Sequence, residues 1–131
     1  MFIIRKELKF EAAHVLSGSY SKCCQQVHGH SYRVEVFLKS EKLNEDGMVV
    51  DFGKVKEAVG PLIESWDHSF MASEQSHIND FLPAKMIIFP TNPTAENMAQ
   101  YIFLQVKPFL PQLYKVRVHE TATGYAEYFE E

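Results

Sequence analysis

The clearest strand signal in the chain is the run Ser31-Tyr32-Arg33-Val34-Glu35-Val36-Phe37-Leu38-Lys39, in which apolar and polar side chains alternate. This period of two gives the strand an apolar face with Tyr32, Val34, Val36 and Leu38, and a polar face with Arg33, Glu35 and Lys39. A later run repeats the alternation at Tyr114, Val116 and Val118. Both runs are therefore predicted to be strands that cover a core with one face only.

Two helices are predicted from apolar side chains spaced three and four residues apart. Asp51 is the expected N-cap of the first helix, and Pro93-Thr94 opens the second, which ends near Pro108. Pro61 lies inside the first pattern and is expected to kink or split that helix. The expected apolar stripes are Phe52, Val55, Val59, Leu62, Ile63 and Trp66 in the first helix, and Ala95, Met98, Ala99, Ile102, Phe103 and Val106 in the second.

Shorter elements complete the predicted order. They are strands at 1–12, 85–89 and 125–129, turns at 44–47 and 121–124, and an irregular segment at 69–83. The order is then two strands, two helices and two strands, with one small extra strand. We therefore expect a single α+β domain over residues 1–131, with an antiparallel sheet and helices packed on one face.

Composition is that of an ordinary globular protein. The chain has 131 residues, of which 46% are hydrophobic and 23% charged, and its net charge is −4. It has no Lys/Arg run, which argues against a nucleic-acid partner, and no apolar stretch of membrane-spanning length. The N-terminus lacks a signal-peptide pattern. Cys23 and Cys24 are adjacent and cannot form a structural disulfide, so we expect a reducing, cytoplasmic location.

Three imidazoles and a thiol fall within seventeen residues, at His14, Cys24, His28 and His30. On a strand, His28 and His30 point to the same face, and His14 from a neighbouring strand would make a third nitrogen ligand. Three protein ligands with an open fourth position are typical of a catalytic zinc site. The alternatives are a structural zinc site that includes the thiol, another transition ion, and ordinary histidines without a metal.

Six motifs occur in a fixed order along the chain. They are Phe10-Glu11-Ala12-Ala13-His14, Cys24-x-x-x-His28-Gly29-His30, Gly47-Met48-Val49-Val50-Asp51-Phe52, Asp67-His68, Pro93-Thr94-Ala95-Glu96 and Glu120-Thr121. Together they resemble the 6-pyruvoyltetrahydropterin synthase family over nearly the whole chain. The interval from Cys to His is more similar to the 6-carboxytetrahydropterin synthase branch, which serves queuosine biosynthesis. The resemblance implies the tunnelling fold (T-fold), an antiparallel four-stranded sheet with two helices packed on one face.

The resemblance also implies roles for single residues. His14, His28 and His30 resemble the family's zinc ligands, and Cys24 resembles its catalytic thiol, whereas Cys23 has no counterpart. Because adjacent strand residues point in opposite directions, only one of the two cysteines is expected to face the metal.

Four further positions match family residues. Asp67 and His68 resemble an acid–base pair that acts through separate contacts, since successive side chains rarely hydrogen-bond in catalytic geometry. Glu120 resembles the anchor of the pterin ring, because one carboxylate can accept hydrogen bonds from two neighbouring N–H donors. Thr94 and Glu96 either cap the second helix or line the pterin pocket.

The activity implied by the resemblance is that of a zinc-dependent lyase. It would convert 7,8-dihydroneopterin triphosphate to 6-carboxy-5,6,7,8-tetrahydropterin, acetaldehyde and triphosphate. The alternatives are a 6-pyruvoyltetrahydropterin synthase, an aldolase acting on dihydroneopterin, and a zinc- or pterin-binding module without turnover. The implied assembly is a homo-hexamer made of two trimers, with active sites between subunits.

Overall fold

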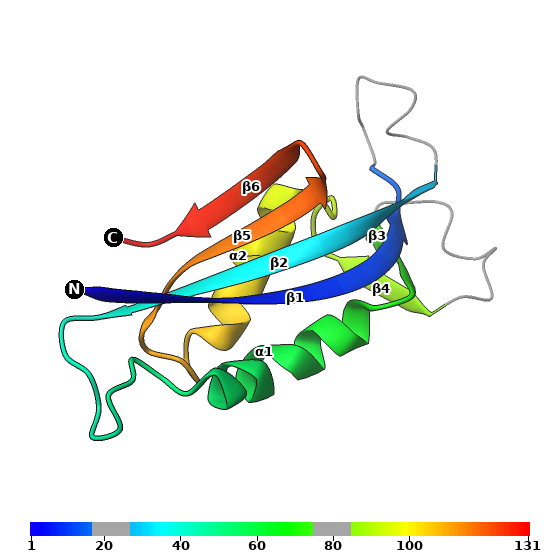
Figure 1. The fold of residues 1–131 in the computed structure, drawn as a ribbon. Helices are drawn as coiled ribbons and strands as arrows, with labels where there is room; N and C mark the ends of the chain where they lie inside the picture. Colours follow the sequence, from blue (N-terminus) through cyan, green and yellow to red (C-terminus); the bar gives the residue numbers. More distant parts are fainter. Residues whose placement is uncertain (17–26, 75–84) are drawn as a thin grey trace.

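The computed structural model describes residues 1–16, 27–74 and 85–131. Two helices lie on one face of a curved sheet (Figure 1). Among the described residues, no helix is long and apolar enough to cross a membrane. The elements are β1 (Phe2–His14), β2 (His28–Ser40), α1 (Phe52–Trp66), β3 (Ser69–Ser73), β4 (Met86–Phe89), α2 (Ala95–Val106), β5 (Leu113–Thr121) and β6 (Gly124–Phe129).

The sheet has six strands in the order β4-β3-β1-β2-β5-β6, so the expected count of four is wrong, although the α+β class is confirmed. The pairs β1–β2, β2–β5 and β5–β6 are antiparallel, as predicted. However, β3 runs parallel to β1, and β4 runs parallel to β3. The sheet is therefore mixed rather than purely antiparallel.

The strand β3 lies where an irregular segment was expected. All five of its residues, Ser69–Ser73, are buried, so the strand shows no alternation of apolar and polar side chains. A strand that is covered on both faces loses the period-two pattern by which sequence analysis finds strands. The error thus follows from burial of both faces of β3.

The long antiparallel pair of β1 and β2 forms the centre of the sheet. Its register runs from Phe2 opposite Ser40 to His14 opposite His28. The apolar face predicted for β2 is confirmed, because Tyr32, Val34, Val36 and Leu38 are all buried. This face packs against the helices. Other side chains that point to the same face near the start of β2 therefore also lie on the helix side of the sheet.

Helix α1 begins as predicted, with the side chain of Asp51 accepting a hydrogen bond from the backbone N–H of Gly53. Pro61 does not split the helix, which continues to Trp66. A proline removes one backbone hydrogen bond, and the buried face of this helix holds it together across that gap. The buried residues are Val55, Val59, Ile63 and Trp66, whereas Phe52 is 51% exposed and is not part of the core.

Helix α2 matches its prediction more closely. The hydroxyl of Thr94 caps its start by accepting a hydrogen bond from the N–H of Asn97. All six residues of the predicted apolar stripe are buried. The helix packs on β5 and β6 at the sheet edge farthest from β4.

In β5, one residue lies on the face opposite to the predicted one. Val116 and Val118 are buried as expected, but Tyr114 is only half-buried. The register of β5 against β2 shifts between Phe37 and Leu38, and Leu113 fills the core position instead. Tyr114 then stacks edge-on with Phe37 on the other face. A β-bulge of this kind moves side chains to the opposite face.

The sheet face away from the helices carries a charged network around a buried carboxylate. Arg5 Nε and His119 Nε2 both donate to Glu35, whose side chain is 6% exposed. Arg117 lies 3.6 Å from the same carboxylate, and Arg33 donates to Nδ1 of His119. Burial acts to raise the pKa of Glu35, but the hydrogen bonds from His119 and Arg5 outweigh it and hold the pKa below its usual value.

Glu35→Gln is expected to lower the free energy of unfolding by about 2 kcal/mol near neutral pH, because it removes charge-assisted hydrogen bonds from a buried site. A carboxylate whose pKa is lower in the folded state stabilises the protein above its unfolded pKa of 4.5, and that contribution is lost as the pH falls through the folded value. The difference between wild type and variant should therefore shrink under acid conditions. Urea unfolding over a range of pH measures it, with the exposed Glu41→Gln as control. A pH-independent difference would contradict the prediction.

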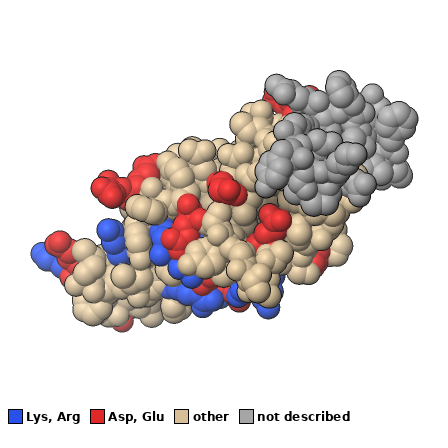
Figure 2. Space-filling view, turned by 90° about the horizontal axis from the view of Figure 1, so that it is seen from above, with Lys and Arg blue, Asp and Glu red and all other residues tan. Residues whose placement is uncertain are grey.

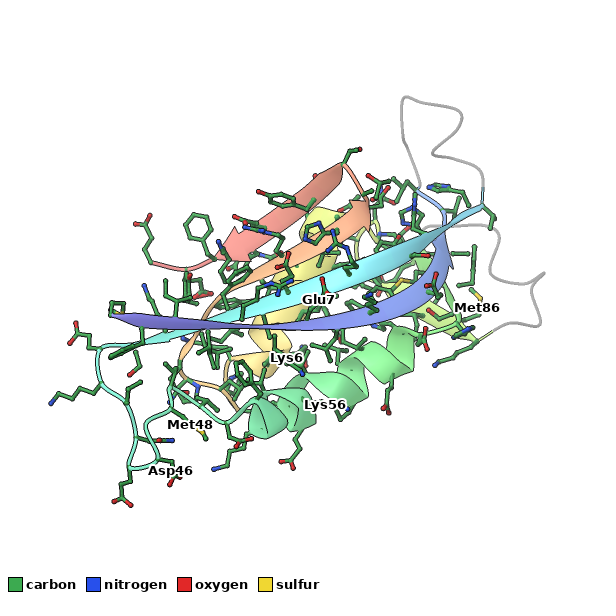
Figure 3. The ribbon with its side chains drawn as sticks, in the orientation of Figure 1. Lys6, Glu7, Asp46, Met48, Lys56 and Met86 are labelled. Carbon is green, nitrogen blue, oxygen red and sulfur yellow. The ribbon has the colours of Figure 1, made fainter. Side chains whose placement is uncertain are left out.

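Figure 2 shows acidic and basic side chains intermixed on the face that it displays, without a large area of one sign. A groove between β1 and α1 has the same mixed character. Lys6, Glu7 and Lys56, which Figure 3 labels, line this groove of about 290 Å³. On the described part of the face in Figure 2, there is no extended basic patch of the kind that binds nucleic acid.

Candidate metal centre

The first and second strands bring three histidines to one end of the sheet. His14 ends β1 and lies directly opposite His28, which begins β2. His30 follows two residues later on the same strand face and lies opposite Ala12. Glu120, near the end of β5, joins this group. One ligand atom from each of His14, His28, His30 and Glu120 lies within 4.8 Å of the others.

The three imidazole rings are close, with centroids 4.4 to 5.1 Å apart, and they are steeply inclined to one another, at 71° to 90°. Nε2 of His14 is 2.8 Å from Nε2 of His28. Nε2 of His30 is 3.1 Å from Oε1 of Glu120. Even so, this His30 nitrogen is buried without a hydrogen bond from any described residue, because the carboxylate is near it but outside hydrogen-bond geometry. A buried ring nitrogen in this state fits a metal ligand, and the donor set suits zinc.

The surroundings of His14 and His30 favour the neutral imidazole, which is the form that binds metals. Burial lowers the pKa of His14, and the hydrogen bond to Pro93 only partly offsets it. Burial also lowers the pKa of His30, although the negative charge of Glu120 opposes the shift. His14 is completely buried, so its ring has no contact with solvent.

Two groups that sequence analysis missed set the orientation of His14. The carbonyl oxygen of Pro93 lies 2.9 Å from Nδ1, and the hydroxyl of Tyr32 lies 3.1 Å from the same nitrogen. A carbonyl can only accept, so Nδ1 carries the hydrogen and Nε2 presents its lone pair to the other histidines. Tyr32 was predicted as core only, and Pro93 as a helix start. No local pattern could have shown that both meet His14.

Tyr32→Phe is expected to weaken metal binding by up to about tenfold, since groups that orient metal ligands typically contribute that much or more. The Pro93 carbonyl still accepts a hydrogen bond from His14 in this variant, so the expected loss of metal affinity is small for a group of this kind. Competition with a chromogenic chelator measures the affinity. Phe10→Leu, which changes the ring stacked on Tyr32 but leaves the hydroxyl in place, is the matched control. Equal affinities for Tyr32→Phe and wild type would contradict an orienting role for the hydroxyl.

Asp67 and His68 form a tight local unit at the end of α1. Oδ1 of Asp67 accepts from the backbone N–H of Glu11 at 2.9 Å, and Oδ2 lies 3.1 Å from Nδ1 of His68. The expectation that these neighbours contact different partners is therefore wrong. The hydrogen bond from Glu11 is the main cause that lowers the pKa of Asp67, ahead of the contribution of His68.

The backbone of His68 has an unusual conformation that makes this contact possible. Its φ is +58°, a region that residues other than glycine rarely occupy. The backbone N–H of His68 donates to the carbonyl of Glu11 at 2.6 Å, which holds the turn in place. The ring is 79% exposed at the rim of a shallow hollow of about 440 Å³ that His30 also lines. His68 thus shares this hollow with one residue of the histidine group.

The two remaining candidate residues with a described position have separate environments. Thr94 caps α2, as described above, so its capping role is realised. Glu96 lines a hollow of about 260 Å³ together with Glu120, Thr121 and Tyr125. Cys23 and Cys24 lie outside the described residues, so the structure adds nothing to what their spacing predicts.

Comparison with known proteins names the family. The sequence profile of the 6-pyruvoyl tetrahydropterin synthase family matches residues 3–131. This chain belongs to that family. Among its curated relatives is the 6-carboxy-5,6,7,8-tetrahydropterin synthase of Synechocystis, which is 38% identical over 98% of this chain and 94% of that protein. The enzyme of the same name from Aquifex aeolicus is 39% identical over 98% of both chains.

Solved structures share the fold of this chain. The 6-pyruvoyl tetrahydropterin synthase of Caenorhabditis elegans superposes with a TM-score of 0.78 over 99% of this chain and 96% of that one, at 26% identity. A protein of Wolinella succinogenes reaches a TM-score of 0.88 over 99% and 98%, at 20% identity, which shows the fold alone. The predicted membership of the synthase family and the predicted T-fold are both confirmed.

Proposed function

We propose that this chain is a zinc-dependent 6-carboxy-5,6,7,8-tetrahydropterin synthase, a lyase that converts 7,8-dihydroneopterin triphosphate to the carboxypterin, acetaldehyde and triphosphate. The observation that carries the proposal is the group of His14, His28, His30 and Glu120 at the end of the sheet. The names of the relatives, at 38% and 39% identity over nearly the whole chain, support this reaction. Residues 1–131 would act as one catalytic domain in the cytoplasm.

The three histidines would hold zinc, which supplies a Lewis acid that polarises oxygens of the substrate side chain. Glu120 would anchor the pterin, because its carboxylate can accept from the 2-amino group and the adjacent ring N–H together. Cys24 would move protons at the side-chain carbons, with His68 and Asp67 as its proton partners. The contact between Asp67 and His68 supports that pairing, since a carboxylate at this distance can orient the imidazole ring.

The alternative reaction is that of 6-pyruvoyltetrahydropterin synthase, and a module that binds zinc or pterin without turnover is a third reading. The experiment that separates them uses zinc-loaded protein and the triphosphate substrate, with products identified by mass. The 6-carboxy product together with acetaldehyde supports the proposal. The 6-pyruvoyl product would replace it with the alternative, and unchanged substrate would leave only binding.

We also propose that the chain assembles as a homo-oligomer, a hexamer made of two trimers. Two sheet edges support the proposal. β1 pairs with β3 only from Ala12 to His14, so residues 2–11 have no strand on that side among the described residues. β6 is the opposite edge of the sheet. Open edges of this length present unpaired backbone groups that a second copy can satisfy.

Sedimentation velocity at micromolar concentration is expected to find the hexamer, or at least a trimer. Ile3→Lys, which puts a charge on the open edge of β1, should shift the protein toward smaller species. Phe109→Lys is the matched control, because Phe109 is 74% exposed and lies on neither edge. A monomeric wild type would contradict the proposal, and with it any active site shared between subunits.

A further inference from the structure

Glu120 lies between two different environments. On one side, its Oε1 is 3.1 Å from Nε2 of His30, within the group of potential metal ligands. On the other side, it lines the hollow of about 260 Å³ that also contains Glu96 and Tyr125. Its side chain is 33% exposed, so it is neither buried in the core nor free in solvent. One carboxylate therefore borders both the metal centre and an open space.

With this carboxylate, the candidate metal centre has four possible ligands. Three imidazoles leave the fourth position of a tetrahedral zinc site open, and a carboxylate oxygen is an accepted zinc ligand. Nε2 of His30 is buried without a hydrogen bond from the described residues, although Oε1 of Glu120 is so close. Two such atoms side by side without a hydrogen bond between them are arranged as two ligands of one ion would be.

The same carboxylate cannot serve the metal and the pterin together. Accepting two neighbouring N–H donors of a pterin uses both oxygens in one plane. A carboxylate turned toward the metal through one oxygen no longer presents both oxygens to the two ring donors in that plane. We propose that Glu120 is the fourth ligand of the metal in the absence of substrate, and that the pterin ring displaces it from the metal. The displacement by pterin rests on the proposed function, whereas the role of Glu120 as a metal ligand does not.

Displacement has a thermodynamic consequence that can be measured. If metal and pterin compete for Glu120, each must weaken the binding of the other by the same factor. Pterin that lacks a side chain is the suitable probe, because it presents the ring donors but no hydroxyl groups to bind the metal. The metal-free protein is therefore expected to bind this pterin more tightly than the zinc-loaded protein. The natural substrate would open the metal for its own side-chain oxygens by the same exchange.

The first experiment measures zinc affinity by competition with a chelator in wild type, Glu120→Gln and Glu96→Gln. Loss of a ligand should weaken zinc by at least about tenfold, since even groups that only support a ligand contribute that much. Glu96→Gln is matched because it lines the same hollow but is not in the ligand group, and its zinc affinity should equal that of wild type. Equal affinities for Glu120→Gln and wild type would overturn the ligand role.

The second experiment follows the visible absorption of the cobalt-loaded protein during titration with the side-chain-free pterin, while fluorescence reports pterin binding. The wild-type cobalt spectrum should change in step with binding, as Glu120 leaves the metal. Binding without a spectral change, or equal pterin affinity with and without metal, would overturn the exchange. Pterin that does not bind at all would count against the proposed function and the exchange together, and the zinc affinities would still decide the ligand role.

Discussion

Replacing His28 by Ala is expected to abolish stoichiometric zinc and, with it, turnover. His28 faces His14 directly, with 2.8 Å between their Nε2 atoms, so it contributes one of three imidazoles to a single point. Removing it leaves at most His14, His30 and Glu120, and the neutral nitrogen donors fall from three to two. Metal analysis of the purified protein measures the loss directly, and we expect less than about a tenth of an equivalent.

Thermal unfolding gives an independent readout of the same variant. A ligand that binds only the folded state stabilises it, by about 4 kcal/mol at a thousandfold excess over its dissociation constant. A chelator should therefore lower the melting temperature of wild type but not that of His28→Ala. His68→Ala is the control, because His68 is exposed and outside the ligand group, and it should keep its zinc while losing activity. Full zinc in His28→Ala would remove that residue from the site.

The second large effect is expected from the adjacent cysteines. Cys24→Ala should lower turnover by about 10²- to 10⁴-fold, the range that a positioned acid or base contributes, while zinc and pterin binding persist. Cys23→Ala should keep most of its activity. The reason is spacing, because Cys24 stands four residues before His28, the interval that the resemblance assigns to the catalytic thiol.

The two cysteine variants form a matched pair, since each removes one thiol at neighbouring positions. Steady-state turnover and zinc content should be measured for both. An inactive Cys23→Ala with an active Cys24→Ala would mean that the assignment of the thiol is wrong by one residue. If both variants kept the turnover rate of wild type, the thiol would be removed from the mechanism. His68 and Asp67 would then be favoured as the only proton-transfer groups.

Local patterns in the sequence were enough for several elements. The faces of β2, the N-cap at Asp51 and the buried stripe of α2 were predicted correctly. Each depends on side chains within one or two turns of helix or a few strand residues, so periodicity reports it directly. The convergence of His28 and His30 on one face has the same origin, because alternate residues of a strand point to the same side.

Tertiary structure alone decided the rest. β3 was missed because burial of both faces removes its pattern, and Tyr114 was misplaced because a bulge in β5 shifts the register. The contact of Glu120 with His30 and the hydrogen bond that orients His14 through Pro93 join residues 90 and 79 positions apart. The sequence by itself determined which side chains are available and which strand faces carry them. Which of them meet depends on strand order and register, and these are set by packing of the whole sheet against its helices.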